Sequence, residues 1–155
     1  MKNKNRQKKS QQKAKRAINK IKLLLSNNII KIRKNDFLEQ FMLCETACKI
    51  IIQDYYKEKG KQVKEKDIKL HMGTIKSAMK YAGYCIDEKL LATIFKSNTQ
   101  RGNKSCKELR DGIAHGMHIE DIKEVADRYY LLSSKMQQFL EYICDAPNRN
   151  IKKAS

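Results

Sequence analysis

A scarcity of helix-breaking residues limits this chain more than any other feature of its sequence. Its 155 residues include a single proline, Pro147, and only six glycines. β-Sandwiches and barrels need many tight turns, which proline and glycine usually supply. The sequence therefore predicts an all-α fold, in one domain long enough to bury a hydrophobic core.

The longest apolar pattern lies in the first half of the chain. Apolar residues recur at spacings of three and four from Phe37 to Tyr56, which predicts a long helix. Asp36 and Glu39 have the spacing of a capping box, and Gly60 fits a C-terminal stop. We therefore expect this helix to begin at Asp36.

Shorter patterns predict the remaining helices. A second helix is expected over residues 67–83, and a third begins after Asp87, a candidate N-cap. A polar loop then leads into a short helix that Ser105 would cap, with Glu108 at capping-box spacing. A last, long helix is expected over residues 120–144.

These patterns and the charge distribution divide the chain into three parts. An antiparallel helical bundle of four to five main helices is expected over residues 36–146, followed by a flexible tail, residues 147–155. Thirteen of the 34 Lys and Arg residues precede Asp36, the first acidic residue, whereas the remaining 21 face 17 acidic residues. Residues 1–35 therefore form a basic N-terminal arm on a nearly balanced domain.

The basic N-terminal arm is typical of proteins that bind a polyanion, either nucleic acid or an anionic membrane surface. Residues 1–13 lack apolar anchors, and we expect them to be disordered. Residues 14–32 have an amphipathic helical pattern. That helix could lie on a membrane, bind RNA or pack against its own domain. The apolar positions of its stripe are Ile18, Ile21, Leu25, Ile29 and Ile32.

The five cysteines bear on the compartment and on cofactors. An odd number without a recognisable secretory signal is typical of reduced thiols, so we expect a cytoplasmic protein. Cys44 and Cys48 are interpreted as small buried hydrophobic residues. The spacings of Cys and His do not suggest a metal site, and we expect no cofactor. No apolar run approaches the roughly 18 residues of a membrane span.

Candidate catalytic residues lie in KELRDGIAHGM, residues 107–117. Arg110 precedes His115 by five residues, and Asp111 follows the arginine directly. An arginine offers a fork of donors to phosphate, and a histidine exchanges protons near neutral pH. Together they suit metal-independent cleavage of RNA. His115 would move a proton at the ribose 2′-hydroxyl or the leaving 5′-oxygen, while Arg110 stabilises charge on the phosphoryl oxygens.

The spacing of this pair poses a geometric problem. Five residues of an α-helix turn through about 500°, which places the two side chains about 140° apart. A break at Gly112 or Gly116 could bring them together, or two copies of the motif could meet across a twofold axis. The alternative is structural, with Arg110 and His115 binding only neighbouring carbonyls or carboxylates.

The segment LRDGIAHG resembles the signature of the HEPN superfamily: an arginine, a polar residue, about three more residues and a histidine. The resemblance implies an all-α domain that forms a homodimer, with two motifs in one cleft. It also implies a metal-independent endoribonuclease of a prokaryotic toxin–antitoxin or phage-defence system, with an antitoxin protein as a candidate partner. Arg110 and His115 would be catalytic, and Asp111 would orient one of them or shape the cleft. Ala114 replaces the tyrosine of the subgroup that pairs with nucleotidyltransferase antitoxins.

Further candidates flank the motif. Arg101, Lys104 and Lys107 could follow an RNA backbone, or could simply be solvated. His118 could line the cleft. Two other functions remain open at this point: a non-catalytic RNA- or ribosome-binding protein, and a peripheral membrane protein that uses residues 14–32.

Overall fold

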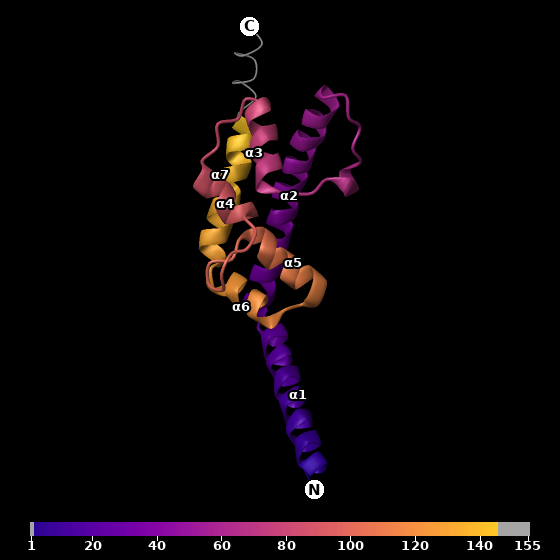
Figure 1. Cartoon of the computed structure of the whole chain (residues 1–155). Helices are drawn as coiled ribbons and strands as arrows, with labels where there is room; N and C mark the ends of the chain where they lie inside the picture. Colours follow the sequence, from indigo (N-terminus) through magenta and orange to yellow (C-terminus); the bar gives the residue numbers. More distant parts are fainter. Residues whose placement is uncertain (1, 146–155) are drawn as a thin grey trace.

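The computed structural model describes residues 2–145, apart from the side chains of residues 23–25, and every regular element in this part of the chain is helical. The predicted all-α class is therefore confirmed. The predicted tail, residues 147–155, lies outside the described residues. The elements, shown in Figure 1, are α1 (Lys2–Ser26), α2 (Asn28–Glu58), the 3₁₀ turn η1 (Glu65–Asp67), α3 (Met72–Tyr81), α4 (Glu88–Phe95), α5 (Cys106–Gly116), α6 (Ile119–Asp127) and α7 (Tyr129–Asp145).

The long helix α2 begins before Asp36, so the predicted start is wrong. Asn27 caps α2, because its side chain accepts hydrogen bonds from two backbone N–H groups of the first turn. Asp36 lies inside the helix and accepts a hydrogen bond from the hydroxyl of Tyr129. The apolar pattern begins at Phe37 because α2 enters the core there. The pattern thus marked the start of burial and not the start of the helix.

Helix α1 extends away from the other helices (Figure 1). All its described side chains are exposed, including those of Ile18 and Ile21, and so are those of Ile29 and Ile32 in α2. Residues 2–13, expected to be disordered, form the first turns of α1. For these isoleucines, the alternative in which the amphipathic helix packs against its own domain is therefore wrong. The side chain of Leu25 lies outside the described part.

Helices α2 and α7 run parallel, which corrects the predicted antiparallel arrangement. Contacts between them advance in the same direction along both helices. The pairs are Asp36 with Tyr129, Gln40 with Ser133, and Cys44 with Met136. From the end of α2, the chain runs back to the start of α7 through the shorter elements α3 to α6 (Figure 1).

The helix predicted over residues 120–144 is in fact two helices, α6 and α7, which meet at Arg128. The guanidinium of Arg128 donates to the carbonyl of Lys104 and to the carboxylate of Glu124. Seven α-helices result in the described chain, where four to five were expected. The break was hidden because both helices turn an apolar side to the same core.

Other boundaries depend on local signals. Asp87 and Ser105 cap α4 and α5 as predicted, each accepting a hydrogen bond from a backbone N–H in the first turn. The second predicted helix begins only at Met72, because the chain before it is extended. Ile68 and Leu70 are buried in that extended segment without forming a helix.

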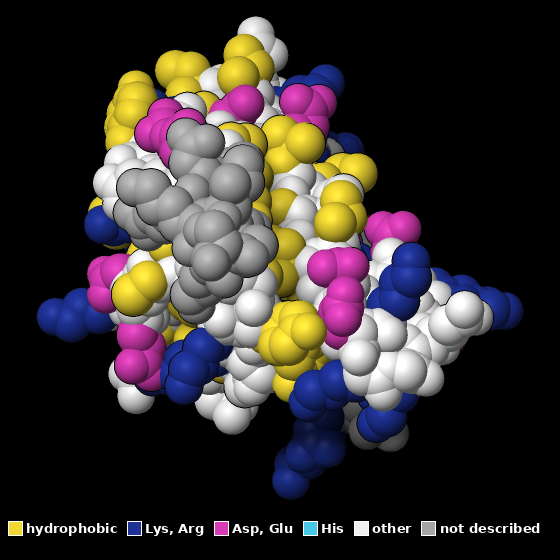
Figure 2. Space-filling view, turned by 90° about the horizontal axis from the view of Figure 1, so that it is seen from above, with side chains coloured by type: hydrophobic (Ala, Val, Ile, Leu, Met, Phe, Trp, Pro, Cys, Tyr) yellow, Lys and Arg dark blue, Asp and Glu magenta, His cyan; other side chains and the backbone are white. Residues whose placement is uncertain are grey.

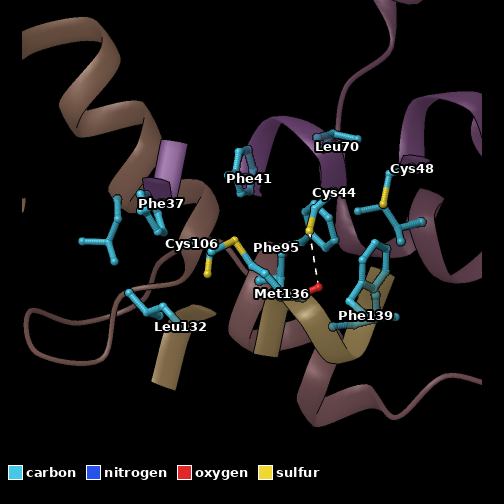
Figure 3. Close-up of a cluster of buried hydrophobic side chains, with 14 of the residues drawn as sticks. Phe37, Phe41, Cys44, Cys48, Leu70, Phe95, Cys106, Leu132, Met136 and Phe139 are labelled. Atoms are coloured by element: carbon cyan, nitrogen blue, oxygen red, sulfur yellow. Dashed lines mark hydrogen bonds between the residues drawn. The ribbon is translucent and has the colours of Figure 1, made fainter. Parts of the chain in front are cut away.

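The core is one cluster to which α2 to α7 all contribute, and Figure 3 shows the part of it where α2, α4 and α7 meet. The ring of Phe95 is tilted against that of Phe41 at 6.0 Å and meets that of Phe139 edge to face at 5.6 Å, measured between ring centroids. Cys44 and Cys48 are fully buried, as predicted, and the thiol of Cys44 lies 3.8 Å from the carbonyl oxygen of Met136. Burial raises the pKa of Cys44 to about 12, so this thiol stays neutral and packs as an apolar group.

Candidate functional site

The Arg–His motif lies on a single continuous helix, α5. This helix runs without a break through Gly112 and ends at Met117, whose backbone is left-handed with φ 46° and ψ 45°. Of the alternatives left open by the sequence, a break at Gly112 is therefore wrong. The break after Gly116 comes beyond His115 and does not redirect its side chain. Arg110 and His115 stay about 140° apart around α5.

Arg110 is fixed against α2. Its Nε donates a 2.8 Å hydrogen bond to Asp111, and its Nη2 lies 2.7 Å from a carboxylate oxygen of Glu45. The guanidinium carbon lies 4.7 Å from the ring centroid of Phe41. Nη1 of Arg110 donates no hydrogen bond to any described residue. Two carboxylates and a ring thus orient the guanidinium and leave one of its edges available to an anion.

His115 lies in the last turn of α5 and is exposed. No residue in the described part of the chain forms a hydrogen bond or ion pair with its imidazole. The single chain therefore places Arg110 and His115 on one helix but does not bring them together.

Two buried carboxylates on α6 were not predicted from the sequence. Asp121 is 1% exposed and Glu124 is 6% exposed. Glu124 accepts hydrogen bonds from the backbone N–H groups of Gly102 at 2.6 Å and Lys104 at 3.0 Å. The signal that could have revealed them is their spacing of three, in phase with the buried Ile122 and Val125.

Two cationic side chains of the loop before α5 bind Asp121. Its Oδ1 accepts hydrogen bonds from Arg101 and, at 3.0 Å, from Nζ of Lys104. Burial raises the pKa of this carboxyl, but the hydrogen bonds and charges of Lys104 and Arg101 outweigh it, so the pKa lies below its ordinary value. Asp121 thus stays ionised and anchors the loop on α6.

The basic residues predicted to follow an RNA backbone all have partners within the fold. Arg101 and Lys104 bind Asp121, and Nζ of Lys107 donates to the carbonyl of Leu70 at 3.1 Å. Each of these three side chains therefore binds a group of the protein itself and is not simply solvated. His118 lies at the N-cap position of α6, and its Nδ1 is 3.6 Å from Oδ2 of Asp121.

A groove of about 800 Å³ lies elsewhere, between α2 and the segment that follows it. Its walls include Ile50, Asp54, Lys57 and Tyr84. None of the predicted site residues lines this groove, so the groove and the Arg–His motif are separate features.

Comparisons with family models, curated proteins and solved structures found no match. The resemblance to the HEPN signature therefore stays a prediction from the sequence. Among the described residues, no cluster of three or more His, Cys, Asp and Glu side chains could hold a metal ion. None of the described helices combines the length and apolarity needed to cross a bilayer.

Proposed function

We propose that this protein is a metal-independent endoribonuclease of HEPN type, in which two copies of the chain form one RNA cleft. The observation that carries the proposal is the setting of Arg110. Asp111 and Glu45 hold its guanidinium with one edge open, on the same helix as the exposed His115. We further propose that it is a cytoplasmic enzyme of a prokaryotic defence or toxin–antitoxin system, with an antitoxin as its protein partner.

The reaction is a transesterification within the RNA chain. One imidazole removes the proton from a ribose 2′-hydroxyl, and the oxygen forms a bond to the adjacent phosphorus. The bond from phosphorus to the 5′-oxygen breaks, and a protonated group supplies the proton to that oxygen. A 2′,3′-cyclic phosphate remains. Arg110 stabilises the charge on the phosphoryl oxygens, and His115 carries one of the two protons.

Two copies solve the geometric problem of the motif. Arg110 and His115 point about 140° apart on α5. A twofold axis places the same patch opposite itself, so Arg110 of one chain can face His115 of the other. The cleft then lies between two α5 helices.

The basic N-terminal arm supplies affinity in this proposal. Helix α1 holds ten Lys and Arg residues, all exposed, and no acidic residue. On the face of the molecule shown in Figure 2, by contrast, basic, acidic and apolar side chains are interspersed. Contacts between α1 and RNA phosphates would release counterions, so binding would weaken as salt rises.

Cleavage of labelled RNA in the presence of EDTA tests the proposal. Wild type, Arg110→Ala and His115→Ala are compared after folding and mass have been checked. We expect only wild type to cut, with a cyclic phosphate at the product end. The proposal is wrong if wild type leaves RNA intact at several salt concentrations, or if all three proteins cut alike.

A second candidate function is non-catalytic RNA binding. It is favoured by the two carboxylates on Arg110, which already compensate its charge, and by the separation of Arg110 from His115. In that case the basic arm would bind RNA and the motif would be structural. RNA bound equally by wild type and His115→Ala, without cleavage by either, would support it.

A further inference from the structure

Both glycines next to the Arg–His motif make room for side chains from the start of α6. A Cβ atom at Gly112 would collide with Oδ2 of Asp121 and lie 2.8 Å from its Cγ. One at Gly116 would collide with Nε2 of His118 and lie 2.6 Å from its Cδ2, so this edge of the imidazole faces Gly116. Both distances are shorter than real Cβ contacts. The end of α5 therefore packs directly on His118 and Asp121, with no side chain of its own in between.

Asp121 has one oxygen that the fold leaves unused. Oδ1 accepts hydrogen bonds from Arg101 and Lys104, but Oδ2 is buried and has no hydrogen-bond partner among the described residues. An unsatisfied buried carboxylate oxygen is costly and calls for an explanation. The nearest ion-pair candidate for it is Nδ1 of His118, at 3.6 Å.

His118 lies where its Nδ1–H can donate a hydrogen bond to that oxygen. Its side chain is 63% exposed, whereas that of Asp121 is 1% exposed. The 3.6 Å separation exceeds a hydrogen bond, and a ring movement of roughly 0.5 Å closes it. Once Nδ1–H donates to Oδ2, the tautomer is fixed and Nε2 carries the lone pair that can accept a proton.

We propose that His118 and Asp121 form a second proton-transfer pair in the same RNA cleft, with Asp121 as the positioning residue and His118 as the group that removes the 2′-hydroxyl proton. This proposal rests on the ribonuclease function proposed above. Transesterification needs one group that takes a proton and another that gives one. His115, which has no orienting partner among the described residues, then protonates the 5′-oxygen.

The charged surroundings of the pair are compatible with this role. Arg101 and Lys104 reach Asp121 from the loop, and Glu124, three residues further along α6, lies 3.8 Å from Arg101. Helix α5 approaches the pair at Gly112 and Gly116. The loop cations keep Asp121 ionised, so its free oxygen accepts a hydrogen bond throughout the neutral pH range.

His71 provides a matched control. Like His118, it is an exposed histidine at the N-cap position of a helix and makes no side-chain capping bond. No described residue pairs its imidazole with a carboxylate. His118→Gln and His71→Gln therefore remove the same group from two equivalent positions, and exposure of both favours normal folding of the variants.

The experiment compares cleavage and imidazole tautomers in the full-length protein. We expect His118→Gln to cut RNA at least about 100-fold more slowly than His71→Gln, with unchanged RNA affinity and one limb of the pH–rate profile lost. By nitrogen NMR, at a pH where imidazoles are neutral, His118 should carry its proton on Nδ1 more than His71 does. Asp121→Asn should abolish that difference.

Two results overturn the proposal in distinguishable ways. If wild type cuts RNA and His118→Gln cuts as fast as His71→Gln, the ribonuclease function stands and the second pair is wrong. If wild type does not cut RNA at all, the ribonuclease function is wrong and the catalytic role of His118 is wrong with it. The NMR comparison then still reports whether Asp121 orients His118.

Discussion

Two basic regions of this molecule use the same residue types in opposite ways. In α1, ten Lys and Arg side chains are exposed, and no described residue forms an ion pair with them. In the loop before α5, Arg101 and Lys104 bind carboxylates that are almost fully buried. Both regions look alike in the sequence, as polar segments rich in positive charge.

The partner decides which use a basic residue has. Lys104 meets Asp121 because α6 returns to the loop, whereas the arm extends away from the domain (Figure 1). Exposed ion pairs contribute about 0–1 kcal/mol, but removing one partner of a buried pair costs about 3–5 kcal/mol. Charges of the loop therefore stabilise the fold, and charges of the arm remain available to an external polyanion.

The largest effect on stability is expected at Glu124. Glu124→Ala leaves two backbone N–H groups of the loop without their acceptor and removes one of the two acceptors of Arg128, which keeps the carbonyl of Lys104. We expect the free energy of unfolding to fall by about 3 kcal/mol, measured by urea denaturation. The exposed Glu120 on the same helix is the control, and Glu120→Ala should change it by less than about 0.5 kcal/mol. Equal effects at both sites would contradict a buried anchor.

A glycine-to-alanine pair sharpens the comparison at the α5–α6 contact. At Gly112 a Cβ would collide with the carboxylate of Asp121, whereas at Gly73 in α3 it would meet nothing within 4 Å. We expect Gly112→Ala to destabilise by about 1–3 kcal/mol and Gly73→Ala to stabilise by up to about 1 kcal/mol. Thermal unfolding measures both. The same sign at both positions would show that Asp121 does not approach α5 this closely.

Acid should weaken the loop anchor in a defined direction. The pKa of Asp121 is lower in the folded chain than its ordinary value, which is about 3.9 in an unfolded chain. The unfolded chain therefore binds the proton first, and the contribution of Asp121 to stability is lost as pH falls below about 4. Urea denaturation across this range should show a weaker pH dependence for Asp121→Asn. An unchanged dependence would mean that the loop cations do not hold this carboxylate.

The smallest effect on stability is expected from removing α1. A chain without residues 2–26 keeps the Asn27 cap and every described core residue. Its free energy of unfolding should change by less than about 0.5 kcal/mol, while RNA affinity falls and loses most of its salt dependence. Filter binding at several salt concentrations measures the slope. An unchanged slope would place the RNA contacts on the bundle instead of the arm.

Local signals in the sequence predicted part of this fold. Asp87 and Ser105 act as caps because each contacts a backbone N–H only two or three residues away. At the break between α6 and α7, Arg128 donates to the carbonyl of Lys104, which is 24 residues distant, and no local pattern encodes that contact. The parallel course of α2 and α7 has the same cause, since it depends on pairs such as Asp36 with Tyr129 that lie far apart in the chain.

Only the geometry of the candidate site can be compared with the sequence. Residue type and spacing made Arg110, Asp111 and His115 candidates, and helix geometry alone indicated that Arg110 and His115 diverge. The roles of the two motif glycines could not be read from α5, because Asp121 and His118 fill the space that they leave. Glu45 was equally hidden, as it reaches Arg110 from α2.

Complementation between two inactive variants tests most directly whether Arg110 and His115 act together across a dimer. Arg110→Ala and His115→Ala chains are unfolded together, refolded as a mixture and assayed on labelled RNA with EDTA, with heterodimer content measured by native mass spectrometry. We expect each variant alone to be inactive and the mixture to cut RNA, because the heterodimer holds one intact arginine facing one intact histidine. A mixture that contains the heterodimer and still fails to cut, beside an active wild type, would contradict a site shared between two chains.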